Sequence, residues 1–385
     1  MRIAKLFGEF FESEKISGFM LIACTVFSLL LTNSGIGDNY NSLWNASFAG
    51  HTLTDWINDG LMTIFFLLAG LEIKREIYSG GLKTIRHALL PVMAAVGGMI
   101  VPALVHVVWN LGTTSQRGFG IPMATDIAFS LGILSLAGKR IPTAVKIFLT
   151  AFAIIDDLGA ILIIAFFYSN GLSWINLCIA LGIFAGLLIM ARLKVKGLLF
   201  YIVPGAAMWY FMLQSGVHPT ISGVLLAFSI HFGSGGDNTP SSKLQHFLHK
   251  PVAFIIMPLF ALANTCIILD RQSILHLSDR NSLGIMLGLF IGKPLGIFAM
   301  AWFTLKTRLG SLQEGLSLRH VLGAGILGGI GFTMSIFIAL LAFPGSALIA
   351  TSKIAIVAAS FLSGITGLVY LRAIKPIHPY SLPDE

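Results

Sequence analysis

The sequence predicts an all-α polytopic membrane protein, and three observations support this fold class: the composition, the lengths of the apolar runs and the placement of the basic residues. Of the 385 residues, 56% are hydrophobic and only 11% are charged, and the mean hydropathy is +0.85. A soluble globular chain carries about 25% charged residues. This chain therefore has too little polar surface to face water along most of its length, and lipid is the expected solvent.

Apolar runs long enough to cross a membrane recur along the whole chain. A helix needs about 20 residues to cross roughly 30 Å of hydrocarbon, and it satisfies its own backbone hydrogen bonds there. We expect about twelve transmembrane helices in one transmembrane domain, residues 1–385, with a tail at 371–385. The expected spans are 16–31, 56–73, 87–109, 118–137, 144–168, 174–190, 198–213, 220–232, 251–268, 282–305, 319–343 and 353–370.

Lysine and arginine test this count of spans. Twenty of the 25 basic residues fall on one side of the expected membrane, three fall on the other, and Lys293 and Lys353 lie inside spans. By the positive-inside rule both termini then lie in the cytoplasm, as in a multi-pass protein of the cell inner membrane. The net charge of +8 follows from this topology, and the basic residues form no patch that indicates nucleic-acid binding.

The first outer loop, residues 33–55, is long and polar and contains no lysine or arginine. Within it, residues 43–53 are rich in aromatic and strand-compatible residues around a turn signal at Ala49-Gly50. This pattern predicts a small β-hairpin, with an irregular surface loop as the alternative.

Four charged residues lie near the middle of expected spans: Asp126, Asp156, Asp157 and Lys293. A lone charge at that depth costs at least ~2.5 kcal/mol on insertion scales, so each is a candidate functional residue. The alternative is an ion pair that only holds helices together. Such pairs stabilise weakly because desolvation offsets their attraction, and three acids against one base leave a surplus of acid. Lys293 fits a structural counter-ion better than the aspartates do.

The adjacent aspartates, Asp156 and Asp157, suit the exchange of a cation for protons. Neighbours on a helix point about 100° apart, so both side chains can border one cavity. Burial and a second carboxylate both disfavour the charged form of a carboxyl group, so such a group can hold a proton near neutral pH. Hard carboxylate oxygens also suit Na+ or Li+. Cation and protons then compete for the same oxygens, and release of two protons per Na+ would make the exchange electrogenic.

Two of the expected spans carry signs of interruption. The fourth has glycine and proline early and Thr125-Asp126 at its middle, which disfavours one straight helix. The eleventh is dense in glycine up to Gly331, with Thr333 following, although such glycines also serve close helix packing. Paired interrupted helices point to the midplane site of a transporter. We expect Asp126 to offset helix N-termini at the crossing and Lys293 to offset C-termini.

Four motifs lie at or near these residues. They are Ala-Phe-Ala-Ile-Ile-Asp-Asp-Leu-Gly-Ala at 151–160, Pro-Met-Ala-Thr-Asp-Ile-Ala-Phe at 122–129, Gly-Leu-Glu-Ile-Lys-Arg-Glu at 70–76 and Gly-Gly-Ile-Gly-Phe-Thr-Met-Ser at 328–335. Together they resemble the NhaA-type sodium/proton antiporters, and the resemblance runs from about residue 8 to 370. It implies twelve spans with inverted-topology repeats, in which the broken spans four and eleven cross near the cation site.

For the site, the resemblance implies that Asp157 is the principal carboxylate for Na+ and protons, with Asp156 as its partner. Thr125 and Asp126 would line the crossing. Lys293 would pair with Asp156 in one state and part from it when Na+ binds.

The resemblance further implies activation by alkaline pH from the cytoplasmic face. The candidate pH-sensing residues are Glu72, Arg75, Glu76, His218, Gln245, His246 and His249. Gln245 stands where members of the family often have a glutamate, a change that would alter the strength or midpoint of the pH response. Ordinary interfacial charges and solvated histidines are the alternative interpretation of this group.

The expected function is the exchange of cytoplasmic Na+ or Li+ for external protons, in the service of pH homeostasis and salt tolerance. The protein would be a secondary active transporter in membrane lipid, and the resemblance implies a homodimer joined through loop 33–55. No cofactor is expected, because the three cysteines lie in apolar runs without metal-ligand spacing. An intramembrane enzyme is a weaker alternative, since no further acid follows Asp157 before Asp237. A cation channel, the other alternative, needs a continuous wet path rather than a proton-holding carboxylate.

Overall fold

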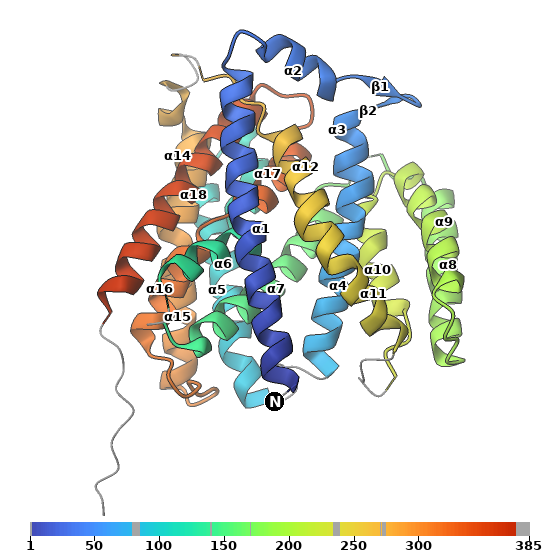
Figure 1. The fold of residues 1–385 in the computed structure, drawn as a ribbon. Coiled ribbons are helices and arrows are strands. Elements are labelled where there is room, and N and C mark those ends of the chain that lie inside the picture. Colours follow the sequence, from blue (N-terminus) through green and yellow to red (C-terminus); the bar gives the residue numbers. More distant parts are fainter. Residues whose placement is uncertain are drawn as a thin grey trace, which may run out of the picture.

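The computed structural model shows an almost entirely helical bundle whose long helices run between two faces (Figure 1). It describes residues 2–78, 85–138, 141–169, 171–233, 239–269, 271 and 275–374. We call the face where α1 begins the lower face, and the face that carries the strands β1 and β2 the upper face.

The helices follow one another with short connections. Up to residue 192 they are α1 (Arg2–Thr32), α2 (Gly37–Trp44), α3 (Leu53–Asp55), α4 (Met62–Tyr78), α5 (Ile85–Trp109), α6 (Ile127–Leu136), α7 (Thr143–Phe167) and α8 (Trp174–Arg192). From residue 199 onward they are α9 (Leu199–Ser215), α10 (Thr220–Ser229), α11 (Pro240–Pro251), α12 (Met257–Asn264), α14 (Arg280–Leu287), α15 (Lys293–Lys306), α16 (Leu318–Gly328), α17 (Phe332–Ala342) and α18 (Leu348–Ala373). Between them lie the π-helical turns η1 (Trp56–Leu61), η4 (Val252–Ile256) and η6 (Gly288–Gly292) and the 3-10 helices η3 (Thr114–Met123) and η5 (His276–Ser278).

The described helices include eight segments that are long and apolar enough to cross a membrane, and two bent helix pairs raise the number to ten. Two further apolar helices are shorter, α9 with 17 residues and α10 with 10. The chain is therefore a mostly helical, multi-pass membrane protein. Residues 375–385 of the expected tail lie outside the described residues.

The loop between α1 and α4 combines helix and strand. Its first part forms α2, and a two-residue ladder then pairs β1 (Ser47–Phe48) antiparallel with β2 (His51–Thr52). The turn residues Ala49 and Gly50 both have positive φ, 52° and 85°, as tight two-residue turns of this kind require. The indole N–H of Trp56 donates to the carbonyl of Phe48 at 3.0 Å and ties this ladder to η1.

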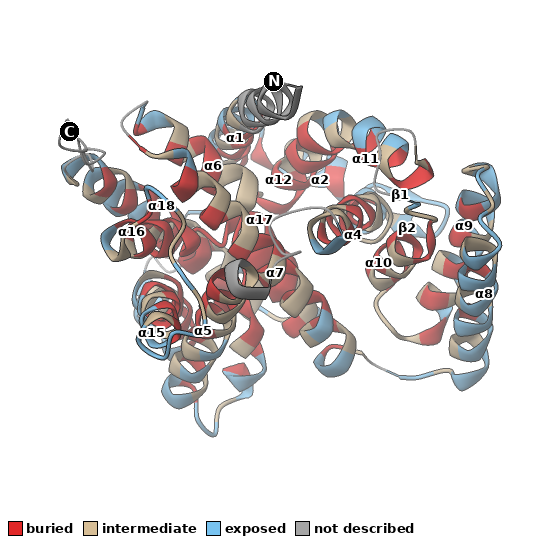
Figure 2. Cartoon of the chain, turned by 90° about the horizontal axis from the view of Figure 1, so that it is seen from below, coloured by how far each residue is buried: buried red, intermediate tan, exposed pale blue. Residues whose placement is uncertain are grey.

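The core of the bundle is packed closely where α5 meets α15. A Cβ added at Gly97 or at Gly296 would overlap the backbone of the opposite helix, so glycine at both positions lets the two helices approach to backbone contact. Lys293, at the start of α15, is thereby held inside the bundle with no exposed surface. Figure 2 shows buried residues concentrated around α7 and α17, whereas α8 is largely exposed.

Two spans are broken in the middle. The 3-10 helix η3 ends at Met123 and α6 begins at Ile127 with a bend of 49°, while α16 and α17 meet at a bend of 48°. The two breaks touch, because the backbone N–H of Asp126 donates to the carbonyl of Ile330 at 2.7 Å. This contact, which we call the crossing, lies beside the middle of α7.

Candidate functional site

The four charged residues that the sequence places in mid-span are all buried. Asp126 and Asp156 are 1% exposed, Asp157 is 2% exposed and Lys293 is fully buried. Asp126 directly precedes α6, the two adjacent aspartates belong to α7, and Lys293 follows the π-helical turn η6. Such turns inside helices are frequent at functional sites, because the extra residue changes the direction of the side chains that follow.

Asp126 caps two helices at once. Its Oδ1 accepts a hydrogen bond from the backbone N–H of Phe129 at 2.9 Å, in the first turn of α6. Its Oδ2 accepts from the backbone N–H and the hydroxyl of Thr333 at 3.2 and 2.5 Å, in the first turn of α17. The N-cap residue of α17 is Gly331, which has no side chain to accept these hydrogen bonds. Asp126 therefore replaces the missing cap and faces the positive ends of both helix dipoles.

Lys293 and Thr125 hold the carboxylate of Asp156. The Lys293 ammonium donates to Oδ2 of Asp156 at 2.5 Å and also to the carbonyl of Met123, where η3 ends. The Thr125 hydroxyl lies within hydrogen-bond distance of the same Oδ2, at 2.8 Å, and of the carbonyl of Gly328, at 2.9 Å. Lys293 thus places a positive charge at the C-terminal end of a half-helix, where it opposes the helix dipole.

Asp157 lacks such partners. Its carboxylate makes no hydrogen bond to any described residue, and its Oδ1 is buried and unpartnered. It lines a cavity that is partly open to solvent. A buried carboxylate without a donor is costly, so its oxygens are suited to bind a proton or a cation. The described residues contain no cluster of three His, Cys, Asp or Glu side chains for a resident metal ion.

Two candidate pH-sensing residues line the same cavity: Glu72 of α4 and His249 of α11. Both lie on the lower-face side of Asp157, so the cavity extends from Asp157 toward that face. We call the end lined by Glu72 and His249 the mouth of the cavity. Arg75 and Glu76, one turn further along α4, contact each other at 3.4 Å. The candidates of α11 that do not line the cavity are Gln245, which is buried, and His246, which is exposed.

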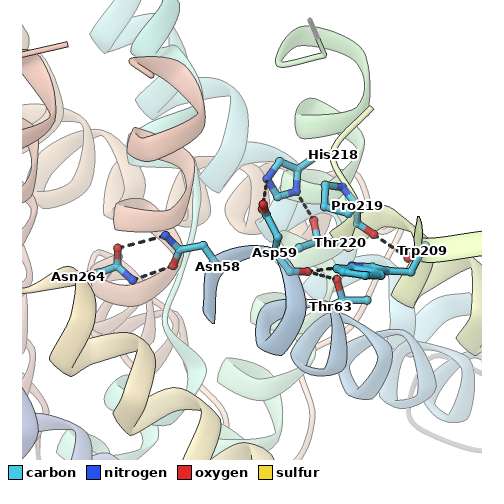
Figure 3. A network of polar contacts seen from close by, with 9 residues as sticks. Asn58, Asp59, Thr63, Trp209, His218, Pro219, Thr220 and Asn264 are labelled. Atoms are coloured by element: carbon cyan, nitrogen blue, oxygen red, sulfur yellow. Dashed lines mark hydrogen bonds and ion pairs between the residues drawn. The ribbon is translucent and has the colours of Figure 1, made fainter. Parts of the chain in front are cut away.

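His218 is separated from the other pH-sensing candidates. It lies between α9 and α10, where its Nε2 is 3.4 Å from Oδ1 of Asp59 and its Nδ1 is 2.8 Å from the hydroxyl of Thr220 (Figure 3). Asp59 and Glu72 belong to one helical segment and are separated by roughly 20 Å along its axis. Burial lowers the pKa of His218 to about 4, which favours the neutral ring at pH 7.

The same network ties three helices together near the upper face. Asn58 and Asn264 exchange two amide hydrogen bonds of 2.8 and 3.5 Å, and the indole of Trp209 donates to the carbonyl of Asp59 at 3.0 Å (Figure 3). Asn58 and Asp59 both lie in the π-helical turn η1. This turn lets consecutive residues reach α12 on one side and the α9–α10 connection on the other.

Sequence reasoning missed two serines at the crossing. Ser130 is the fourth residue of α6 and donates to the carbonyl of Leu327 at 3.0 Å, while Ser335 is the fourth residue of α17 and donates to that of Ile121 at 2.7 Å. Each serine thus satisfies a carbonyl that the other broken span leaves free at its helix end. The signal in the sequence is a serine at the same distance after each break.

Lys74 belongs to the motif at 70–76, but the sequence alone assigns it no contact. It is 6% exposed and donates to the carbonyls of Ala227, Phe228 and Ile230 at 3.2, 2.8 and 2.5 Å. A lysine in this place caps the C-terminal end of α10.

Comparisons with known proteins show the family to which the chain belongs. The model of the family described as Na+/H+ antiporter 1 matches residues 8–371. The chain is 56% identical over 374 residues to the Na(+)/H(+) antiporter NhaA 1 of Flavobacterium johnsoniae, which covers 97% of this chain and 98% of that protein. It is 57% identical over 372 residues to the Na(+)/H(+) antiporter NhaA of Flavobacterium psychrophilum, with 97% of each covered. The corresponding protein of Cytophaga hutchinsonii is 53% identical over 372 residues, with 97% of this chain and 96% of that protein covered. The chain therefore belongs to the Na+/H+ antiporter 1 family, whose members are transporters and not enzymes.

Proposed function

We propose that the protein exchanges cytoplasmic Na+ or Li+ for external protons across the inner membrane. The observation that carries the proposal is the contrast between two neighbouring carboxylates. Asp156 is held by Lys293 and Thr125, whereas Asp157 lines the cavity with an unpartnered oxygen. Hard oxygens of this kind suit Na+ and Li+, and the same oxygens bind protons.

Exchange follows from competition for these oxygens. When Na+ enters the cavity, it binds the carboxylate of Asp157 and displaces a proton. Na+ also attracts Asp156, whose Oδ1 is unpartnered, and draws it away from Lys293. If a second group also releases a proton for each Na+, the cycle is electrogenic, and the membrane potential contributes ~2.3 kcal/mol per charge per 100 mV. A change of access to the other face then completes the cycle.

The proposed membrane topology has twelve spans. The ten segments that meet the length criterion are joined by α9 and α10, which are apolar but shorter. With the start of α1 and the end of α18 on the lower face, both termini lie in the cytoplasm, as the distribution of basic residues favours. The two broken spans with equivalent serines, Ser130 and Ser335, support the proposal of inverted-topology repeats.

We assign pH control to the mouth of the cavity. Glu72 and His249 line it, and the pair of Arg75 and Glu76 follows on the same helix. Titration of these groups would change the field that an entering cation meets. The hairpin of β1 and β2 projects from the upper face (Figure 1), and we propose that it joins two copies into a homodimer.

The test is a transport measurement in inverted membrane vesicles. At alkaline pH we expect Na+ and Li+, but not K+, to collapse a preformed pH gradient in the wild type. Asp157→Asn should abolish the response, and Asp38→Asn, which changes an exposed residue, should retain it. Normal exchange by Asp157→Asn would contradict the proposed role of the aspartates.

A further inference from the structure

The cavity that contains Asp157 is lined by one hydroxyl that bonds to none of the residues that the structure describes. Among the described residues that line it, Ser17 donates to the carbonyl of Ala253, Thr125 contacts Asp156 and Thr333 donates to Asp126. Thr150 also lines the cavity, but its buried Oγ1 has no hydrogen-bond partner.

This lack of a partner is unusual for a threonine inside a helix. The hydroxyls of Thr25, Thr63 and Thr304 each donate to the carbonyl four residues earlier, at 2.7, 2.5 and 2.7 Å. That local hydrogen bond is the ordinary way for a helix to satisfy a threonine in apolar surroundings. Thr150 lies in the middle of the first half of α7 and forgoes it. A buried polar atom without a partner calls for a specific explanation.

The position of Thr150 on α7 supplies one. Asp157 lies seven positions further along the helix, which is about two turns. Both side chains therefore lie on nearly the same face, about 10 Å apart along the axis. Ile154 lies between them and also lines the cavity. Thr150 is thus nearer the mouth, where Glu72 and His249 lie, and it interrupts a largely apolar wall.

We propose that the hydroxyl oxygen of Thr150 is a further Na+ ligand, which a partly dehydrated cation meets between the cavity mouth and Asp157. A hydroxyl oxygen accepts a cation without carrying charge, so it can replace water molecules that the ion loses in the apolar stretch. The separation of about 10 Å excludes one shared coordination sphere with Asp157. The inference rests on the proposed function, since it adds an earlier position on the route to the aspartates.

The test measures the KM for Na+ and the maximal rate of exchange for wild type, Thr150→Val, Thr150→Ala and Thr150→Ser. Valine keeps the shape of threonine and removes the oxygen. Because one neutral polar contact contributes about a factor of five in affinity, we expect the valine and alanine variants to raise KM about fivefold. The maximal rate should stay within about a factor of two, and serine should restore the wild-type KM.

Thr25→Val is the matched control, because its hydroxyl is buried in a helix but bonds only to Leu21. It should leave KM unchanged. The inference is overturned if the valine and alanine variants keep the wild-type KM, or if serine fails to restore it while Asp157→Asn is inactive. Exchange by Asp157→Asn would instead overturn the proposed function itself.

Discussion

The crossing of the broken helices and the cavity beside it use the same kinds of side chain, but their polar groups are paired in opposite ways. At the crossing, Asp126 accepts three hydrogen bonds. An ammonium and a hydroxyl hold Oδ2 of Asp156, while its Oδ1 has no partner among the described residues. In the cavity, Asp157 and Thr150 present unpartnered oxygens. Buried polar groups with partners fix a structure, whereas those without partners raise its energy until something binds. We infer that the crossing maintains the site and that the cavity performs the exchange.

This comparison predicts that variants at the crossing mainly lower stability, and the largest effect is expected from Lys293→Met. The substitution removes the ammonium from the carboxylate of Asp156, which keeps only the Thr125 hydroxyl, and from the carbonyl of Met123. Loss of one partner from a buried ion pair costs about 3–5 kcal/mol. The unfolding midpoint of the purified protein in detergent should fall clearly below that of the wild type.

The matched variant is the double substitution Lys293→Met with Asp156→Asn. Because it removes the uncompensated charge, it should recover part of the lost stability. If Lys293→Met alone were as stable as the wild type, the ion pair of Lys293 and Asp156 would not hold the crossing together.

A smaller effect is expected from the two serines. Ser130→Ala and Ser335→Ala each leave a carbonyl of the other broken span unpaired, which costs about 1 kcal/mol. Ser135→Ala is the control, since its hydroxyl bonds only to Gly132 within α6. Denaturant titration should give a lower free energy of unfolding for Ser130→Ala and Ser335→Ala than for the control. Equal stability of all three variants would argue against hydrogen bonding between the spans.

The smallest effect on stability is expected in the cavity. Asp157→Asn removes a carboxylate that has no hydrogen-bond partner among the described residues, so unfolding should occur at or above the wild-type midpoint even though exchange is lost. A loss of stability as large as that of Lys293→Met would erase the distinction between the two regions.

The sequence predicted the charged residues of the site because their cost in lipid depends only on their place in an apolar run. Asp126, Asp156, Asp157 and Lys293 were found this way, and the clustered glycines and Pro122 predicted the two breaks. The contacts that the sequence does not predict depend on packing between distant spans. Ser130 pairs with Leu327, which lies 197 residues away in the sequence. A threonine in a helix ordinarily bonds within its own helix, so the residue type gives no sign that Thr150 has no partner among the described residues.

The same limit explains the scattered pH-sensing candidates. Gln245, His246 and His249 are close in sequence, but only His249 faces the cavity, because neighbouring helix positions point in different directions. His218 lies beside Asp59, nearer the opposite face, because the connection between α9 and α10 packs against η1. Sequence proximity and residue type alone do not show which of them share a site.

Competition of Na+ and protons for Asp157 is tested most directly by proton release on Na+ binding. Na+ is added to the purified protein in weakly buffered detergent solution at alkaline pH, and the pH change is recorded for wild type and Asp157→Asn. We expect that Na+ acidifies the wild-type solution, that K+ does not, and that the apparent Na+ affinity weakens as the pH is lowered. Equal proton release from Asp157→Asn, or a Na+ affinity that does not change with pH, would contradict it.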